Sequence, residues 1–125
     1  MKTYKVAIIE DDSFISNMYK TKLKLAGYDV KTAYDGEEGL KLIDEFKPDL
    51  VLMDLMMPNM SGVAALERLK EEILAGKFKV IALTNMGDDD TISNVKKMGV
   101  SDYIVKADVT PTQVEQRVRK VLETK

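Results

Sequence analysis

Polar or charged residues stand where four of the short apolar runs of this sequence end. Glu10 and Asp11 follow the first run, Asp54 ends the third, and Thr84 and Lys106 end the last two. Three carboxylates brought close together repel one another unless a cation neutralises them. Mg²⁺ takes few carboxylate ligands and leaves a position for a phosphate oxygen, while a lysine and a hydroxyl group can bind the other phosphoryl oxygens. These residue types therefore favour phosphoryl transfer, with an aspartate carboxylate as the nucleophile.

The composition limits both the metal and the class of protein. The chain contains no cysteine and no histidine, so any metal must be held by oxygen atoms, which favours Mg²⁺ or Ca²⁺ over zinc. The net charge of −2, with acidic and basic residues interspersed, argues against binding to nucleic-acid phosphates. The start is too polar for a signal peptide, and no apolar run approaches the roughly 20 residues of a membrane span. We expect a cytoplasmic protein with no direct nucleic-acid partner and no membrane partner.

Short apolar runs alternate along the chain with stretches of helical periodicity. The runs predict strands at residues 4–10, 28–33, 49–54, 78–84 and 101–106. The periodic stretches predict helices at residues 13–26, 36–46, 63 to about 75, 89–98 and 111–122. Asp12 and Ser13 are candidate N-cap residues of the first helix, and Pro111 suits the first turn of the last. Five repeated strand–helix units imply one α/β domain over residues 1–125, a parallel sheet with helices on both faces.

Such a sheet would bring the polar strand ends together. The carboxyl ends of parallel strands lie along one edge, where ligands bind at the point at which the strand order reverses. Taken singly, each residue has an ordinary structural explanation. An aspartate such as Asp12 caps a helix, a threonine such as Thr84 supports a turn, and a lysine such as Lys106 is solvated. Their joint occurrence at matching strand ends favours a site.

The segment DLMMPNMSG, from Asp54 to Gly62, resembles the phosphorylation motif of response-regulator receiver domains. The acidic cluster after the first strand, Thr84, and Lys106 with Tyr103 three residues before it resemble the same family. The resemblance covers the whole chain. It implies a single flavodoxin-like, doubly wound domain with strand order 2-1-3-4-5 and a role in two-component phosphorelay signalling.

The resemblance implies a role for each residue of the acidic cluster. Asp54 accepts a phosphoryl group from a histidine kinase or a histidine phosphotransfer protein. Mg²⁺, for which Mn²⁺ can substitute, is bound by Asp54, by Asp11 directly, by Glu10 through water and by the backbone carbonyl of Met56. Such a chain is a signalling protein and not an enzyme: it phosphorylates itself, with at most weak autophosphatase activity.

The resemblance also implies a conformational switch. Thr84 and Lys106 bind phosphoryl oxygens, and Tyr103 changes rotamer as Thr84 moves towards the phosphoryl group. The surface of the fourth helix, fifth strand and fifth helix then binds a downstream protein or output domain. The fourth helix has few apolar residues, so it is either the switching element or simply a frayed surface helix. Charges such as Asp102 and Arg117 could pair between subunits, which leaves a monomer and a phosphorylation-dependent dimer both open.

Two residues depart from the family pattern. Ala107 replaces the usual proline after Lys106, so the lysine is expected in a differently shaped loop, in which Asp108 competes for it. Asn85 replaces a residue that is usually small, and would narrow access to the phosphoryl group.

The resemblance also implies that two positions tune how fast the phosphoryl group is lost, two residues after Asp54 and two after Thr84; Met56 and Met86 occupy them here. Neither side chain can orient an attacking water, so we predict slow autodephosphorylation, over many minutes to hours. The alternative is that both methionines only pack their loops.

Two other classes of function compete with this one. A flavin-binding electron-transfer protein of the same fold needs a loop rich in Ser, Thr and Gly after the first strand, but acidic residues 10–12 would repel the flavin phosphate. A pseudo-receiver, which is an interaction module independent of phosphorylation, stays open because Ala107 and Asn85 depart from the pattern.

Overall fold

The computed structural model of the chain describes residues 3–85 and 89–123. Its strands are β1 (Lys5–Ile9), β2 (Asp29–Ala33), β3 (Leu50–Asp54), β4 (Lys79–Thr84) and β5 (Asp102–Val105). Its helices are α1 (Ser13–Leu25), α2 (Gly36–Phe46), α3 (Gly62–Leu74), α4 (Asp89–Lys97), α5 (Pro111–Glu123) and the short 3₁₀ helix η1 (Lys106–Asp108). The ten predicted elements are all present, whereas η1 was not predicted. None of the helices in the described ranges has the length and apolar character needed to cross a bilayer.

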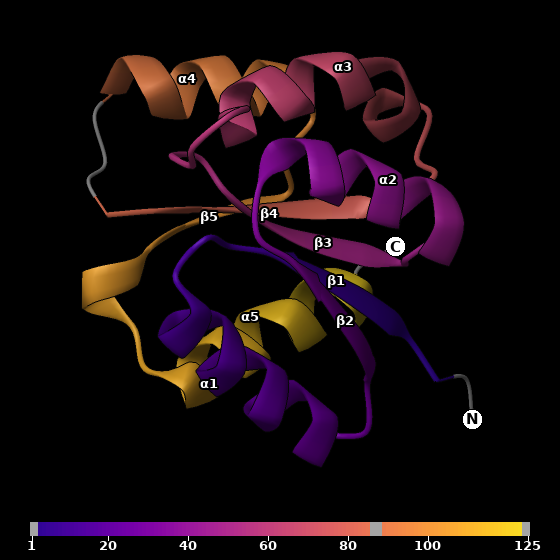
Figure 1. The fold of residues 1–125 in the computed structure, drawn as a ribbon, viewed down its shortest axis with the longest axis vertical. Coiled ribbons are helices and arrows are strands. Elements are labelled where there is room, and N and C mark those ends of the chain that lie inside the picture. Colours follow the sequence, from indigo (N-terminus) through magenta and orange to yellow (C-terminus); the bar gives the residue numbers. More distant parts are fainter. Residues whose placement is uncertain (1–2, 86–88, 124–125) are drawn as a thin grey trace.

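The five strands form one parallel sheet in the order β2-β1-β3-β4-β5, which confirms the predicted order (Figure 1). The chain passes from β1 to β2 on one side and then returns to β3 on the other, so the strand order reverses between β1 and β3. Ile9 pairs with Met53 at this point, one residue before Glu10 and Asp54. Neighbouring connections leave in opposite directions there, and ligands of open α/β sheets bind at such a point. The topology therefore places these two carboxylates where a ligand would bind.

Alternate residues of each strand pack against different layers of helices. Val6 and Ile8 of β1 belong to the core shared with α1 and α5, whereas Ala7 and Ile9 belong to the core shared with α2, α3 and α4. Figure 1 shows the two helical layers on opposite faces of the sheet. The strand β3 is buried along its whole length, which is why its sequence is apolar without alternation. The two cores fix the strands, and so fix the polar residues at their ends.

Polar side chains cap the helices that begin at the carboxyl edge of the sheet. Asp12 Oδ1 accepts hydrogen bonds from the amides of Phe14 and Ile15 at 3.0 and 3.1 Å. Asp35 and Ser61 cap α2 and α3 in the same way. Each cap satisfies amides that have no helical partner and contributes about 1 kcal/mol. Asp12 thus has the structural role considered for it, and it fixes the start of α1 beside Glu10 and Asp11.

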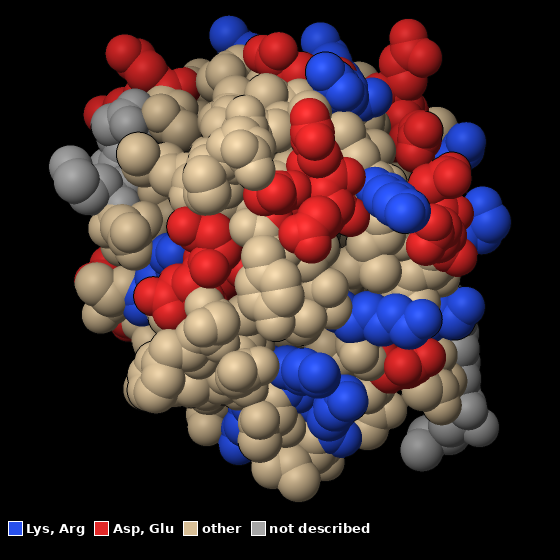
Figure 2. All heavy atoms as spheres, viewed as in Figure 1, with Lys and Arg blue, Asp and Glu red and all other residues tan. Residues whose placement is uncertain are grey.

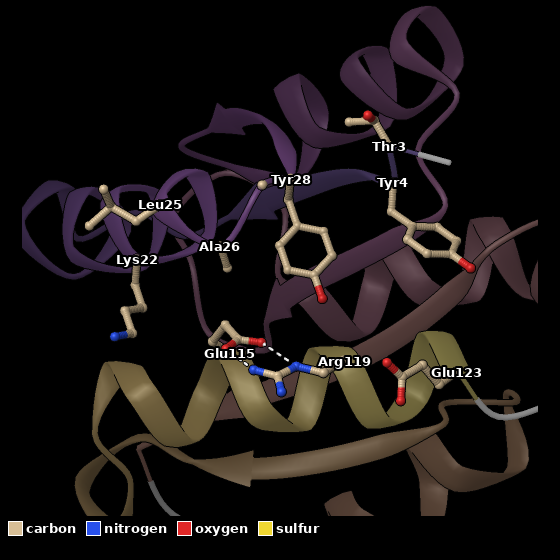
Figure 3. A pocket seen from close by; sticks show the side chains of 10 residues that line it. Thr3, Tyr4, Lys22, Leu25, Ala26, Tyr28, Glu115, Arg119 and Glu123 are labelled. Atoms are coloured by element: carbon tan, nitrogen blue, oxygen red, sulfur yellow. Dashed lines mark hydrogen bonds and ion pairs between the residues drawn. The ribbon is translucent and has the colours of Figure 1, made fainter. Parts of the chain in front are cut away.

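A groove of about 640 Å³ lies at the opposite, amino edge of the sheet, between the end of α1, the start of β1 and α5. Figure 3 shows Tyr28 and Tyr4 on one side of it, with Glu115 and Arg119 across from them. Glu115 is 5% exposed and accepts a hydrogen bond from Arg119 Nε at 3.1 Å. Burial raises the pKa of Tyr28, and Glu115 adds to this rise while Arg119 opposes it. Glu115 and Arg119 of α5 therefore face Tyr28, the residue before β2, at the amino edge and remote from the polar strand ends.

At Gly62 the chain lies directly against the backbone at the end of β3. A Cβ atom placed at Gly62 would lie 1.9 Å from Asp54 O and 2.7 Å from Leu55 Cα. The Gly62 amide donates a hydrogen bond to Leu55 O at 3.1 Å, which holds the two segments together. Because these neighbours are backbone atoms in a packed interior, they cannot swing aside as the end of a flexible side chain can. A side chain at this position would therefore push the loop away from Asp54.

We predict that Gly62→Ala lowers the free energy of unfolding by about 3 kcal/mol, near the upper end of the usual cost of overpacking. Gly76→Ala is the matched control, because its φ is +78° and nothing lies within 4 Å of the added carbon. Its cost comes only from the left-handed backbone, about 1 kcal/mol. Urea unfolding of both variants measures the difference, and equal losses would contradict the steric account.

Candidate functional site

The polar residues at the strand ends lie at the carboxyl edge of the sheet. Glu10 follows β1, Asp54 ends β3 and Thr84 ends β4, and these residues are 0%, 2% and 3% exposed, respectively. Lys106 follows β5 as the first residue of η1, and Asp11, next to Glu10, is exposed. Acidic side chains are rarely this buried unless they are paired or bind a cation. The burial of two carboxylates therefore marks this edge as a candidate site.

The carboxylates of Glu10, Asp11 and Asp54 form a group that could hold a metal ion. One oxygen atom from each residue lies within 4.8 Å of those from the other two. All three donors are carboxylate oxygens, which suit a hard cation, and the exposed Asp11 leaves the group open to water on one side. Mg²⁺ binds through few carboxylates and keeps several waters. The donor set therefore fits Mg²⁺.

Lys106 extends into the same cluster. Its Nζ lies 2.7 Å from Glu10 Oε1 and 3.4 Å from Asp54 Oδ2, and its side chain is 7% exposed. Lys106 begins the 3₁₀ turn η1, and a loop shape that departs from the family pattern stays a prediction. Asp108 lies in that turn and is exposed. The lysine is paired with the two buried carboxylates instead, so the expected competition from Asp108 is not observed.

Two buried carboxylates share one ammonium group in this cluster. Burial and, after it, the hydrogen bond and charge of Glu10 raise the pKa of Asp54 to about 8. Lys106 and the Met56 amide act in the opposite direction but do not cancel this rise. Burial by itself would lower the pKa of Lys106, but the hydrogen bond to Glu10 and the charges of both carboxylates raise it. The cluster therefore lacks one positive charge, which a divalent cation would supply.

The loop after β3 holds the Asp54 carboxylate against its own backbone. The Met56 amide donates a hydrogen bond to Asp54 Oδ1 at 3.2 Å, while the Met56 side chain is 72% exposed. Asn59 adopts a φ of 66° and donates to Asp35 Oδ2 at 3.0 Å, which joins this loop to the start of α2. The role of the Met56 carbonyl as a metal ligand stays a prediction. Met86, the other residue assigned to phosphoryl loss, lies outside the described residues.

Tyr103 lies apart from the carboxylates, on the edge strand β5. Its half-buried side chain lines a groove of about 410 Å³ between α4 and β5, opposite Ile92 and Lys96. The neighbouring strand β4 carries Thr84 at its end, buried at the carboxyl edge. Thr84 and Tyr103 therefore sit on adjacent strands between the carboxylate cluster and the α4–β5 groove. Their coupled movement stays a prediction.

Asp102 and Arg117 form an ion pair within the chain. Arg117 Nε and Nη2 donate to the two carboxylate oxygens of Asp102, both at 2.6 Å. Arg117 Nη2 also donates to Tyr103 O at 3.1 Å, so the guanidinium group fixes the backbone beside the groove. No sequence pattern predicts this pair, because its members lie 15 residues apart on a strand and a helix whose packing the sequence does not specify.

Acidic and basic side chains are interspersed over the face of the molecule that Figure 2 shows. The whole chain carries 19 lysine and arginine residues and 21 aspartate and glutamate residues. A groove or patch of one sign would attract oppositely charged partners at long range. The described residues on this face present mixed charge instead.

The sequence matches the family model described as the response regulator receiver domain over residues 6–119. It is 37% identical over 123 residues to "Probable transcriptional regulator ycf27" of Porphyridium aerugineum, covering 98% of this chain and 49% of that protein. It is 35% identical over 118 residues to "DNA-binding dual master transcriptional regulator RpaA" of Synechocystis sp., covering 94% and 47%. The chain thus spans about half the length of these relatives. Their names do not support the prediction that no nucleic acid is bound.

The fold is also similar to solved structures. The crystal structure of a CheY-like response regulator receiver domain protein from Methanospirillum hungatei JF-1 superposes with a TM-score of 0.89 and 27% sequence identity. The superposition covers 98% of this chain and 95% of that chain. The family match, the strand order and the acidic cluster at the strand-order reversal agree with one another. This chain belongs to the response regulator receiver domain family.

Proposed function

We propose that the chain accepts a phosphoryl group on Asp54 from a histidine kinase or a histidine phosphotransfer protein. The observation that carries this proposal is that Asp54 belongs both to the group of three carboxylates and to the ion pairs of Lys106. One positive charge is already beside Asp54, and the carboxylates provide ligands for a divalent ion. An acceptor needs both, because phosphorylation adds negative charge at this position.

The backbone and Lys106 orient the nucleophile before a donor arrives. The Met56 amide holds Asp54 Oδ1 at 3.2 Å, and Lys106 faces Oδ2 at 3.4 Å. A bond then forms between an Asp54 carboxylate oxygen and phosphorus, as the phosphorus–nitrogen bond of the donor breaks. Lys106 and the buried Thr84 hydroxyl supply a charge and a hydrogen-bond donor to the phosphoryl oxygens. When bound by the carboxylates, Mg²⁺ supplies further positive charge to these oxygens.

The raised pKa of Asp54 gives a physical reason for a metal-dependent reaction. With a pKa of about 8, the Asp54 carboxyl group is mostly protonated at neutral pH in the absence of metal, and a protonated carboxyl group is a poor nucleophile. A nearby cation favours the ionised form and so lowers the pKa. Metal binding and ionisation of the nucleophile are therefore coupled.

The proposed output surface is formed by α4, β5 and α5. Tyr103 lines the groove between α4 and β5, and Thr84 ends the strand next to it. Movement of Thr84 towards a phosphoryl group would leave space for the Tyr103 ring and change the shape of this groove. The helix α4 buries only Val95 among its residues, which suits an element that shifts at low cost. A downstream protein or an output domain would detect the change, and relatives named as transcriptional regulators make a DNA-binding output domain the first to consider.

Met56 supports a long-lived phosphoryl group. The alternative, that this methionine only packs its loop, does not fit a side chain that is 72% exposed. A thioether is a weak hydrogen-bond acceptor and orients water poorly. Hydrolysis of the acyl phosphate would then proceed without an oriented water molecule.

We expect incubation with acetyl phosphate and Mg²⁺ to add one phosphoryl group to the wild-type protein and none to Asp54→Asn. The isosteric amide keeps the shape of the side chain but removes the nucleophile. Asp44→Asn, which changes an exposed acid on α2, is the matched control and should still be modified. Intact-mass spectrometry gives the result. An unmodified wild-type protein would favour the pseudo-receiver.

The raised pKa of Asp54 predicts how stability depends on pH in the absence of metal. The folded protein holds a proton on Asp54 up to about pH 8, whereas the unfolded chain releases it near the ordinary value of 3.8. The stability that Asp54 contributes is therefore fully present below pH 3.8 and is lost as the pH rises through about 8. In EDTA, Asp54→Asn should gain stability relative to the wild type from pH 5 to pH 8.5. Thermal melts across this range test the prediction, and a constant difference would refute it.

A polar residue at position 56 should shorten the lifetime of the phosphoryl group. We predict that Met56→Asn speeds hydrolysis by about 10-fold, the effect expected from a hydrogen bond that orients the attacking water. Met18→Asn, on α1, is the control and should leave the rate unchanged. The decay of the phosphoprotein in Mg²⁺ is followed by mass spectrometry. A wild-type half-life of seconds would show that Met56 does not slow the reaction.

A further inference from the structure

The thioethers are the only sulfur atoms of this protein, because the chain has eight methionines and no cysteine. Two-electron oxidants react with sulfur, and the reactivity of a methionine follows its exposure. Among the methionines that the structure describes, Met56 is the most exposed, at 72%, and Met18 follows at 36%. Met53 and Met98 are buried, at 0% and 4%. A peroxide should therefore react with Met56 first among these side chains.

Met56 lies beside the Asp54 carboxylate, so its oxidation would affect the site. Its amide donates to Asp54 Oδ1 at 3.2 Å, so the most exposed sulfur belongs to a residue whose backbone contacts the carboxylate of the site. The cores on either side of the sheet protect the buried methionines, whereas the loop after β3 leaves Met56 in solvent. Oxidation would thus change the chemistry at the entrance of the site and leave the cores intact.

We propose that Met56 is a site of reversible oxidation by peroxides, and that its sulfoxide shortens the lifetime of the phosphoryl group on Asp54. The second part rests on the proposed function. In the reaction, the oxygen–oxygen bond of hydrogen peroxide breaks and a sulfur–oxygen bond forms. The sulfur is oxidised by two electrons, and the peroxide is reduced to water. Methionine sulfoxide can be reduced enzymatically, so the modification can be reversed.

The sulfoxide differs from the thioether in how well it accepts a hydrogen bond, which decides whether the side chain can hold a water molecule for hydrolysis. A thioether sulfur accepts hydrogen bonds weakly, whereas a sulfoxide carries a polar oxygen. Two residues after Asp54, such an oxygen can hold a water molecule for attack on the acyl phosphate. We expect hydrolysis to become about 3- to 10-fold faster, the effect of one added hydrogen bond.

The first experiment needs no phosphorylation. The unphosphorylated, folded wild-type chain is treated with hydrogen peroxide, and peptides are mapped by mass spectrometry over time. Met56 should gain oxygen before Met18, and Met53 and Met98 should stay unmodified. Oxidation of Met18 at the same rate as Met56, or faster, would overturn the assignment of Met56 as the preferred site.

The second experiment compares each protein with its own untreated sample. Wild-type protein and Met18→Leu should lose the phosphoryl group about 3- to 10-fold faster after oxidation, and sulfoxide reductase should restore the slow rate. Met56→Leu should show no acceleration. An equal acceleration in Met56→Leu would assign the effect to another methionine and overturn the proposal. A chain that never accepts a phosphoryl group would refute the proposed function and the second part of this inference, while the peptide maps still decide the first.

Discussion

The burial of Glu10 and Asp54 beside a single lysine is the interaction on which the rest of the site depends. Lys106 approaches both carboxylates, at 2.7 and 3.4 Å, and neutralises only one charge of the pair. Such a cluster is unfavourable without a further cation, because both carboxylates are buried and like charges repel. Burial and, after it, the hydrogen bond and charge of Glu10 raise the pKa of Asp54, and Lys106 does not cancel this rise. Under the proposed function, metal binding, ionisation of Asp54 and the stability of the fold are linked through the same missing charge.

The fold sustains this cluster because rigid elements fix each of its members. β3 is buried along its whole length, so Asp54 stands at the end of a strand that is closely packed on both faces. Asp12 fixes the start of α1 next to Glu10 and Asp11, and Gly62 lets the following loop lie against the backbone of Asp54. Altering any of these features would cost stability. Together they hold a charged site at an otherwise apolar edge of the sheet.

Much of this arrangement could be predicted from the sequence because it depends on local patterns. The apolar runs and helical periods placed the ten elements, with ends that agree within about one residue, and the cap at Asp12 follows from its residue type. The sequence could not predict η1, because nothing in Lys106, Ala107 and Asp108 specifies a 3₁₀ turn.

Long-range pairing explains the other differences. The ion pair of Asp102 and Arg117 depends on how α5 packs against β5. The burial of Glu115 could not be predicted from the sequence either, because a glutamate on a helix is expected to be solvent-exposed until its neighbours are known. The incomplete neutralisation of the two buried carboxylates by one lysine also depends on long-range pairing. The strand ends predicted that the carboxylates converge, but only the structure shows that one lysine serves two of them.

The central claim is that Asp54, activated within this cluster, carries the phosphoryl group as an acyl phosphate. Borohydride reduces an acyl phosphate and leaves a carboxylate unchanged, so it converts a phosphorylated aspartate to homoserine. After phosphorylation in Mg²⁺ and borohydride treatment, peptide mapping should find homoserine at position 54, and none when EDTA replaces Mg²⁺. Homoserine at another aspartate, or at position 54 to the same extent in EDTA, would contradict the account.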